Sequence, residues 1–206
     1  MKLYCFPFST CTQRVRTILT ELGLNAELIT VDLIKGAHKE EEYLANFHPF
    51  GKVPVLVDGE IQIFESRAIC QYLATKHGSS LSPSEMKRYA AYQQALSIEQ
   101  SYFDPPAHTI AFEMVIKPRK KLGEPDMALV QRSLSQLDLA LQGYERLLSR
   151  QTYLAGGEVT LADLYHLPYG VAIEPLGYTA LLDKYPAVKA WWGRLKERES
   201  WIVITK

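Results

Sequence analysis

The sequence predicts a mixed α/β domain followed by an all-helical domain. Up to about residue 77, short apolar segments typical of strands alternate with helical patterns, whereas beyond residue 83 only helical periodicity recurs. Between them, residues 78–83 read Gly-Ser-Ser-Leu-Ser-Pro, a composition typical of a linker. We therefore expect two domains, at 1–77 and 84–206, joined by a linker at 78–83.

The first domain is predicted to open with a strand and a helix. Residues 2–6 are apolar and aromatic, as in a buried strand, and Pro7 then offers no N–H to continue the ladder. Apolar residues recur at helical spacing over 11–22. Ser9 and Thr10 therefore lie at a helix N-terminus, where unpaired amides and the helix dipole favour a negative charge. From these residues alone, a hydroxyl there either caps the helix or holds an external anion.

The rest of the first domain is predicted to complete a small sheet. Asp58-Gly59 between two apolar runs is a strong hairpin signal. A βαβ unit followed by this hairpin and a closing helix makes a mixed sheet with helices packed on it. The expected strands lie at 2–6, 27–32, 54–57 and 61–64, and the expected helices at 11–22, 39–46 and 66–76.

The second domain is predicted to contain only helices. Thr160 followed by Asp163 forms a capping box, which explains how a helix starts inside a packed bundle and indicates a structural role. The apolar stripe that includes Leu137 and Leu141 is expected to lie in the core. The expected helices lie at 84–115, 126–149, 160–173 and 186–198.

The composition argues against several classes of partner. Lys plus Arg and Asp plus Glu number 23 each, without long like-charge runs, so nucleic acid and an anionic membrane are poor candidates. No apolar stretch approaches the length of a signal-peptide core or a membrane span, so we expect a cytoplasmic protein. The three cysteines, Cys5, Cys11 and Cys70, lack metal-site spacing, which indicates reduced thiols and no bound metal.

Two loops of the first domain carry polar groups whose role the residues alone leave open. His38 and Lys39 lie at the start of a short helix, and Lys52 lies in the loop before the third strand. Taken singly, each is more typical of a solvated surface group than of a ligand contact. Glu65 and Ser66 precede the next helix, which gives a second helix N-terminus with a serine cap and a flanking carboxylate.

Four motifs follow one another along the first domain: Ser9-Thr10-x-x-Gln13-Arg14-Val15, Gly36-x-His38-Lys39, Pro49-Phe50-Gly51-Lys52-Val53-Pro54-Val55-Leu56-x-Asp58-Gly59 and Phe64-Glu65-Ser66-Arg67-Ala68-Ile69. In their order and spacing they resemble the motifs of a cytosolic glutathione S-transferase, and within that family they are most similar to the phi class of plants and fungi. The resemblance covers essentially the whole chain, and the Glu-Ser-Arg-Ala-Ile segment is its most specific part.

The resemblance implies a fold and a catalytic group. Residues 1–77 are similar to a thioredoxin-like domain with a mixed four-stranded sheet, and residues 84–206 to an all-α helical bundle. The Ser9 hydroxyl is implied to donate a hydrogen bond to the sulfur of glutathione, the co-substrate, with Thr10 as a competitor for that role. A thiol is only a few per cent ionised at neutral pH, so a donated hydrogen bond and a helix N-terminus favour the reactive thiolate.

The resemblance also implies the binding residues. Val53, before a cis peptide bond to Pro54, is implied to pair its backbone with the cysteinyl unit of glutathione, as an added strand does. The γ-glutamyl end is implied to contact Glu65, Ser66 and Arg67, and the glycine carboxylate to contact His38, Lys39 and Lys52. The second substrate is expected to be a hydrophobic electrophile whose pocket draws on Phe8, Cys11, Tyr102, Phe103, Ile110, Phe112 and Tyr165.

Further expectations concern assembly and activity. A symmetric homodimer is implied, in which Phe50 is a candidate to enter the second subunit. The leading function is conjugation of glutathione, with reduction of organic hydroperoxides as an added activity. Two alternatives stay open: a non-catalytic carrier of glutathione or hydrophobic ligands, and a thiol-disulfide oxidoreductase that uses Cys11 or Cys5. Serine at position 9, where related thiol transferases have cysteine, argues against the oxidoreductase.

The sequence departs from the phi-class pattern at two places. Cys5-Phe6 stands where Gly-Pro is usual, which is expected to alter the floor of the pocket. His48 stands where asparagine is usual, and this change is expected to affect only the hydrogen bonds inside its loop. Neither departure removes an implied glutathione contact.

Overall fold

The computed structural model describes all 206 residues, which form two compact units. The first comprises Met1–Ser82 together with Glu199–Lys206, and the second comprises Pro83–Arg198. These units differ from the division that the sequence predicts, because most of the linker at 78–83 and the last eight residues group with the first unit. None of the helices combines the length and the apolarity needed to cross a membrane.

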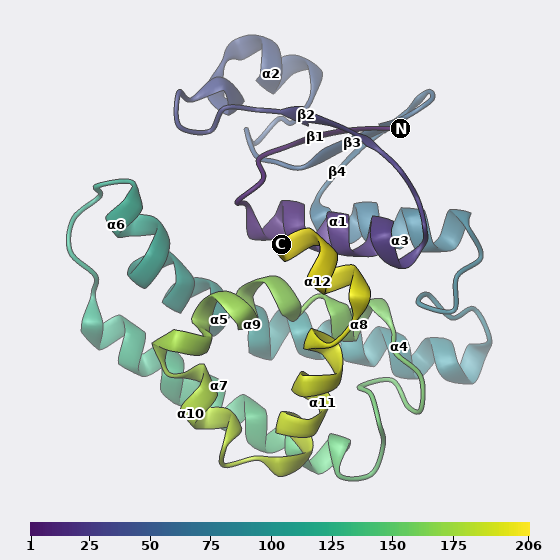
Figure 1. Cartoon of the computed structure of the whole chain (residues 1–206), viewed down its shortest axis with the longest axis vertical. Helices are drawn as coiled ribbons and strands as arrows, with labels where there is room; N and C mark the ends of the chain where they lie inside the picture. The colour runs from purple at the N-terminus through teal and green to yellow at the C-terminus, as the bar shows by residue number, and fades with distance from the viewer. The chain divides into compact units, whose positions relative to one another are not determined.

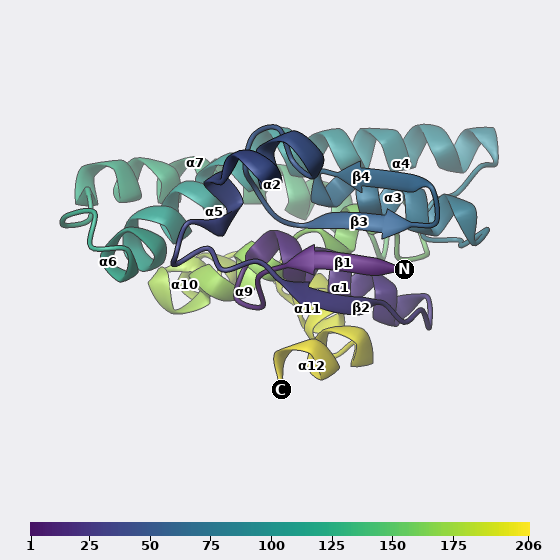
Figure 2. The same ribbon diagram turned by 90° about the horizontal axis from the view of Figure 1, so that it is seen from above.

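The first unit contains the mixed four-stranded sheet that the sequence predicts. Its elements are β1 (Lys2–Cys5), α1 (Thr10–Glu21), β2 (Glu27–Thr30), the short 3-10 helix η1 (Ala37–Lys39), α2 (Glu41–Asn46), β3 (Val55–Asp58), β4 (Ile61–Phe64) and α3 (Ser66–Lys76). The strand order is β2-β1-β3-β4 (Figure 2). β1 runs parallel to β2 and antiparallel to β3, and β3 runs antiparallel to β4. This is the thioredoxin-like arrangement that the resemblance implies.

The strand register brings four connections to one edge of the sheet. Cys5, which ends β1, lies beside Thr30, which ends β2. Val55, which begins β3, pairs with Tyr4 near the end of β1 and with Phe64 at the end of β4. The segments that follow β1, β2 and β4, and the segment that precedes β3, therefore leave the sheet from the same edge. Since these segments carry the polar residues singled out in the sequence, the topology itself gathers the candidate site.

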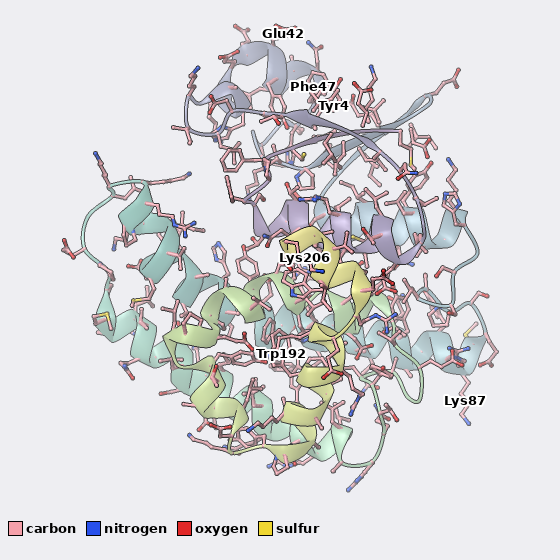
Figure 3. All side chains as sticks on the ribbon, viewed as in Figure 1. Tyr4, Glu42, Phe47, Lys87, Trp192 and Lys206 are labelled. Atoms are coloured by element: carbon pink, nitrogen blue, oxygen red, sulfur yellow. The ribbon has the colours of Figure 1, made fainter.

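Helices cover both faces of the sheet. α1 and α3 pack against each other on one face, and α2 lies on the other (Figure 1). Val15 of α1 and Ile69 and Leu73 of α3 are fully buried. On the α2 side, the rings of Tyr4 and Phe47 lie 4.4 Å apart between centroids (Figure 3). Both faces of the sheet are thus covered, which leaves its edge as the place for a ligand.

The final helix, α12 (Glu199–Thr205), packs against α1 in the first unit. Trp201 is buried, and the Ser200 hydroxyl donates a hydrogen bond to the carboxylate of Glu21, the last residue of α1. The sequence predicts only one helix in this region, over 186–198, and assigns the residues of α12 to the second domain. The structure corrects this prediction, because the partner of α12 lies at the other end of the chain, where no local pattern reveals it.

The second unit is all-helical, as predicted. Helical conformation runs without a gap over residues 86–119, so the expected helix at 84–115 is present, but it contains two π-helical turns, the first just before Pro105 and Pro106, which have no N–H to continue the α-helical ladder. Pro168 likewise follows the point where the expected helix at 160–173 divides. The elements are α4 (Met86–Ile98), the π-helical η2 (Glu99–Phe103), α5 (Asp104–Ala111), the π-helical η3 (Phe112–Ile116), α6 (Lys117–Arg119), α7 (Met127–Leu148), α8 (Leu161–Leu164), α9 (Leu167–Ile173), the 3-10 η4 (Glu174–Leu176), α10 (Tyr178–Leu182) and α11 (Pro186–Lys196).

A buried carboxylate organises the core of the second unit. Asp163 is fully buried, and its two oxygens accept four hydrogen bonds. Oδ2 accepts from the amide and the hydroxyl of Thr160, each at 2.9 Å, which confirms the predicted capping box. Oδ1 accepts from the Leu154 amide and the Trp191 indole N–H, each at 2.9 Å. Asp163 therefore joins the start of α8 to the preceding loop and to α11.

Candidate active site

The N-terminus of α1 presents the Ser9 hydroxyl at the edge where β1 ends. The Ser9 amide donates to the Phe6 carbonyl at 2.9 Å, which turns the chain directly after the strand. Ser9 is the N-cap of α1, and its Oγ accepts a hydrogen bond from the Thr12 amide at 3.3 Å. A hydroxyl that accepts through one lone pair still has its O–H to donate. Ser9 can therefore cap the helix and donate to a ligand at once, so the two alternatives left open by the sequence are compatible.

The N-terminus of α3 lies at the same edge. Glu65 has a φ of 70°, a conformation that non-glycine residues rarely adopt and that concentrates at functional sites. Its side chain is 63% exposed. Ser66 is buried and accepts a hydrogen bond from the Arg14 guanidinium at 2.9 Å, and Arg67 follows it, half-buried, in the first turn. The turn before α3 thus directs a carboxylate outward beside a buried, hydrogen-bonded hydroxyl.

A buried arginine joins the two helix N-termini. Arg14 is 1% exposed, and its Nη1 lies 2.9 Å from Ser66 Oγ and 3.7 Å from Cys11 Sγ. Its fixed positive charge therefore links the first turns of α1 and α3, whose dipoles already favour an anion. Arg14 is not among the residues that the sequence predicts for the site. The sequence does hold a signal for it: Arg14 lies four residues before Ile18 and so on the apolar face of α1. A charged side chain buried on that face requires a partner.

The loop before β3 approaches the same edge. The Val53–Pro54 peptide bond is cis, as the resemblance implies, and both residues are buried. The Lys52 carbonyl accepts a hydrogen bond from a tyrosine hydroxyl of α2 at 2.8 Å. Gly51 has a φ of +57°, and a Cβ atom there would lie 2.5 Å from the His38 carbonyl oxygen. Only glycine allows the loop to approach η1 so closely.

The predicted cations lie on η1 and on this loop. His38 and Lys39 belong to η1, and Lys39 Nζ donates to the Phe50 carbonyl at 3.1 Å. Lys39 and Lys52 are exposed, whereas His38 is half-buried. Because η1 and the loop touch through Gly51 and Phe50, their positive groups lie on adjoining segments. Such a group of donors suits a carboxylate.

The residues expected to line an electrophile pocket differ in their surroundings. Phe103 packs its ring against that of His166, with 4.4 Å between centroids, inside the second unit. Such burial is usual for core positions of helices. The pocket stays a prediction, and the residues of this set that are accessible to solvent are better suited to line it than the buried ones. The exposed residues are Phe8, at 77%, and Tyr102, at 60%, and the half-buried ones are Cys11 and Phe112. The fully buried ones are Phe103, Ile110 and Tyr165.

All three cysteines are free thiols, and two are unsuited to redox chemistry. Burial raises the pKa of the Cys5 thiol, and burial raises the pKa of Cys70 to about 12 despite the nearby guanidinium groups of Arg14 and Arg67. A thiol with a raised pKa stays protonated at neutral pH and is a poor nucleophile. No three His, Cys, Asp or Glu side chains lie close enough together to hold a metal ion.

Two family models match the chain. The N-terminal domain of glutathione S-transferases matches residues 1–75, and the C-terminal domain matches residues 103–199. Among the relatives, glutathione S-transferase PM239X14 of Arabidopsis thaliana is 49% identical over 197 residues, which cover 93% of this chain and 89% of the relative. The likeness therefore extends over both units.

Solved structures agree with this likeness. Glutathione transferase F7 of Populus trichocarpa, a phi-class enzyme, superposes with a TM-score of 0.93 at 35% identity and covers 99% of this chain and 97% of its own. Glutathione S-transferase I of maize, in complex with an atrazine glutathione conjugate, gives a TM-score of 0.89 at 34% identity and covers 98% of this chain and 95% of its own. By its sequence, its fold and the full-length match to these enzymes, the chain belongs to the glutathione S-transferase family.

Proposed function

We propose that this transferase binds glutathione along the edge where β1 and β4 end and β3 begins, and that Ser9 stabilises the bound thiolate. The observation that carries the proposal is the meeting of two helix N-termini at that edge, joined by the buried Arg14. Helix N-termini and a fixed cation favour a bound anion. A sulfur placed at the first turn of α1 meets both the dipole and a hydroxyl that can donate.

The ends of glutathione match the groups on either side of Ser9. The γ-glutamyl end carries an ammonium and a carboxylate, which suit the exposed Glu65 carboxylate and the N-terminus of α3 at Ser66, with Arg67 alongside. The glycine carboxylate suits the imidazole of His38 and the ammonium groups of Lys39 and Lys52, on η1 and on the loop. The backbone of Val53, just before β3, is placed to pair with the cysteinyl unit in the manner of an added strand.

The proposed reaction is nucleophilic attack by the bound sulfur. The thiol proton leaves to solvent, and the hydrogen bond from Ser9 lowers the free energy of the resulting anion. The sulfur lone pair then forms a carbon–sulfur bond to a hydrophobic electrophile, and either the bond to a leaving group breaks or an adduct remains. The same thiolate is the nucleophile that reduction of an organic hydroperoxide requires. A maize relative holds an atrazine glutathione conjugate, a product of this kind.

Cysteine substitution separates this proposal from an oxidoreductase. Single Cys11→Ser and Cys5→Ser variants are expected to keep conjugation of a chromogenic aryl halide within about twofold of wild type, because neither thiol takes part in the attack. Steady-state kinetics with glutathione measure the outcome. Loss of activity on Cys11→Ser would instead support disulfide chemistry at that residue. Tight glutathione binding without any turnover by the wild type would indicate a carrier.

The proposal includes a homodimer and a cytoplasmic location. Phe50 is 66% exposed on the loop that follows α2, and an exposed aromatic side chain beside a fixed turn is a typical interface anchor. The free thiols fit a reducing compartment.

Phe50→Ser is expected to raise the dimer dissociation constant about 100-fold, the scale of an interface hot spot. Sedimentation velocity over a concentration series measures the shift from dimer to monomer. The matched control is Ile34→Ser, which removes another exposed apolar side chain, at 88% even more exposed than Phe50, from the first unit. A wild-type monomer, or equal dissociation constants for the two variants, would refute the role of Phe50.

A further inference from the structure

His48 connects the loop before β3 to the start of α3. Its side chain is almost fully buried, and its ring packs against Phe64 of β4 with 4.6 Å between centroids. Nδ1 accepts a hydrogen bond from the Phe50 amide at 3.3 Å, and Nε2 lies 4.0 Å from Oε1 of Glu65. The sequence predicts that this residue affects only its own loop, but the structure shows that it also faces the carboxylate at the second helix N-terminus.

The two nitrogens of His48 have different roles. A ring nitrogen that accepts an amide N–H carries no proton, so Nδ1 is unprotonated while the bond to Phe50 is made. The neutral ring therefore carries its proton on Nε2, the nitrogen that faces Glu65. One buried ring thus holds the turn at residues 48–50 and points an N–H toward a largely exposed carboxylate.

We propose that His48 is a positioning residue, which holds the Glu65 carboxylate toward the ammonium group of the ligand and weakens ligand binding when it becomes protonated. This inference rests on the proposed binding of the γ-glutamyl end at Glu65. Protonation has two effects. Nδ1 gains a proton and can no longer accept from the Phe50 amide, and the cationic ring competes with the ligand ammonium for the same carboxylate.

The surroundings of His48 set the pH range over which its ring becomes protonated. Burial lowers the pKa of His48 from its ordinary value of 6.5, the ammonium groups of Lys52 and Lys39 lower it further, and the Glu65 carboxylate opposes them. His48 is therefore neutral at and above neutral pH. Ligand affinity is therefore expected to be highest at and above neutral pH and to fall as the pH drops through the lowered pKa of His48, where the ring takes up a proton.

Asparagine at position 48 separates the role of His48 in its own loop from its role beside Glu65. Its side-chain oxygen can accept the amide two residues on, as in an Asx turn, so His48→Asn keeps the bond to Phe50 and removes the nitrogen that faces Glu65. Binding of S-methylglutathione, which has no titratable thiol, is measured by calorimetry. The wild-type dissociation constant is expected to rise about two- to fivefold between about pH 7.5 and about pH 5.5, whereas that of His48→Asn changes less than about 1.5-fold.

Controls separate this inference from the proposed function. His77→Asn removes an exposed histidine at the end of α3 and is expected to keep the wild-type pH profile. His38 is present in wild type, His48→Asn and His77→Asn, so its contribution to the pH dependence of binding cancels when these proteins are compared. If Glu65→Gln binds S-methylglutathione as wild type does, or wild type does not bind it, the proposed site is wrong. If Glu65→Gln weakens binding and His48→Asn keeps the wild-type pH profile, only the inference on His48 is wrong.

A second measurement follows the protons directly. If protonation of His48 weakens binding, then binding must release a proton from His48 at low pH, because the two effects are linked thermodynamically. A histidine that contacts the glycine carboxylate would instead take up a proton, so the calorimetric titration with S-methylglutathione at about pH 6, in two buffers of different ionisation enthalpy, uses the His38→Asn variant. Proton release that disappears above neutral pH supports the proposal. The absence of release, or proton uptake, by this variant would overturn it even if His48→Asn failed to fold.

Discussion

Replacing Ser9 with alanine is expected to lower kcat for aryl halide conjugation by about 10²- to 10³-fold, the usual effect of removing one donor aimed at a developing anion. The affinity for glutathione should change little, because the backbone, Glu65 and the cations still contact the tripeptide in the proposed site. The thiolate absorbance of the bound complex, followed against pH, should show that the sulfur ionises at a higher pH than in wild type. Loss of the N-cap is expected to cost about 1 kcal/mol of stability, which is small beside the catalytic effect.

Two matched variants test whether Ser9 or its neighbour carries this role. Ser9→Thr keeps a hydroxyl and an N-cap acceptor and is expected to retain far more activity than Ser9→Ala. Thr10→Val removes the neighbouring hydroxyl at nearly constant shape and should leave kcat within about threefold of wild type. The reverse result, in which Thr10→Val abolishes turnover while Ser9→Ala keeps it, would show that Thr10 and not Ser9 stabilises the thiolate.

Asp163→Ala is expected to destabilise the protein by about 3–5 kcal/mol, the effect of breaking a buried network by removing its charged member. Four donors, from Leu154, Trp191 and twice from Thr160, lose their acceptor, and these groups are buried where water cannot replace it. For a chain of this size the midpoint of thermal unfolding should fall by roughly 10 °C or more. Thermal and denaturant unfolding measure the change.

Asp183→Asn provides the control for the removal of an aspartate charge. Asp183 is exposed and pairs with Lys189 on the surface of the same unit, so its loss should change stability by less than about 1 kcal/mol. Asp163→Asn adds a graded test, because its amide group keeps one acceptor oxygen and should destabilise less than alanine. If Asp163→Ala is as stable as Asp183→Asn, the capping box does not organise this unit.

The sequence predicts the first unit well because its signals are local. The Asp-Gly turn, Pro7 and the helical spacing within 11–22 place strands and helices within a residue or two of their bounds in the structure. In the second unit, apolar periodicity continues across Pro105 and Pro168, so the pattern suggests regular α-helices where the structure has a π-helical turn before Pro105 and a division at residues 165–166 before Pro168. Periodicity records which face is buried, and it does not show where hydrogen bonds stop.

The candidate site is only partly accessible to sequence reasoning. The register gathers Ser9, Val53 and Glu65 at one edge of the sheet, as their positions next to strand ends suggest. The roles of Arg14 and His48 depend on partners 52 and 17 residues away, Ser66 and Glu65. Such pairs form only when the sheet has brought distant loops together, so no local pattern predicts them. The assignments of ligand contacts stay predictions until the variants are measured.

The contact between α12 and α1 has a consequence for the order of events during translation. The first unit needs residues that the ribosome adds only after the whole second unit has been made. The nascent sheet and its helices therefore wait with one side of α1 uncovered while more than a hundred further residues emerge. Chaperone contact with that uncovered side is consequently expected to end only when the closing segment docks.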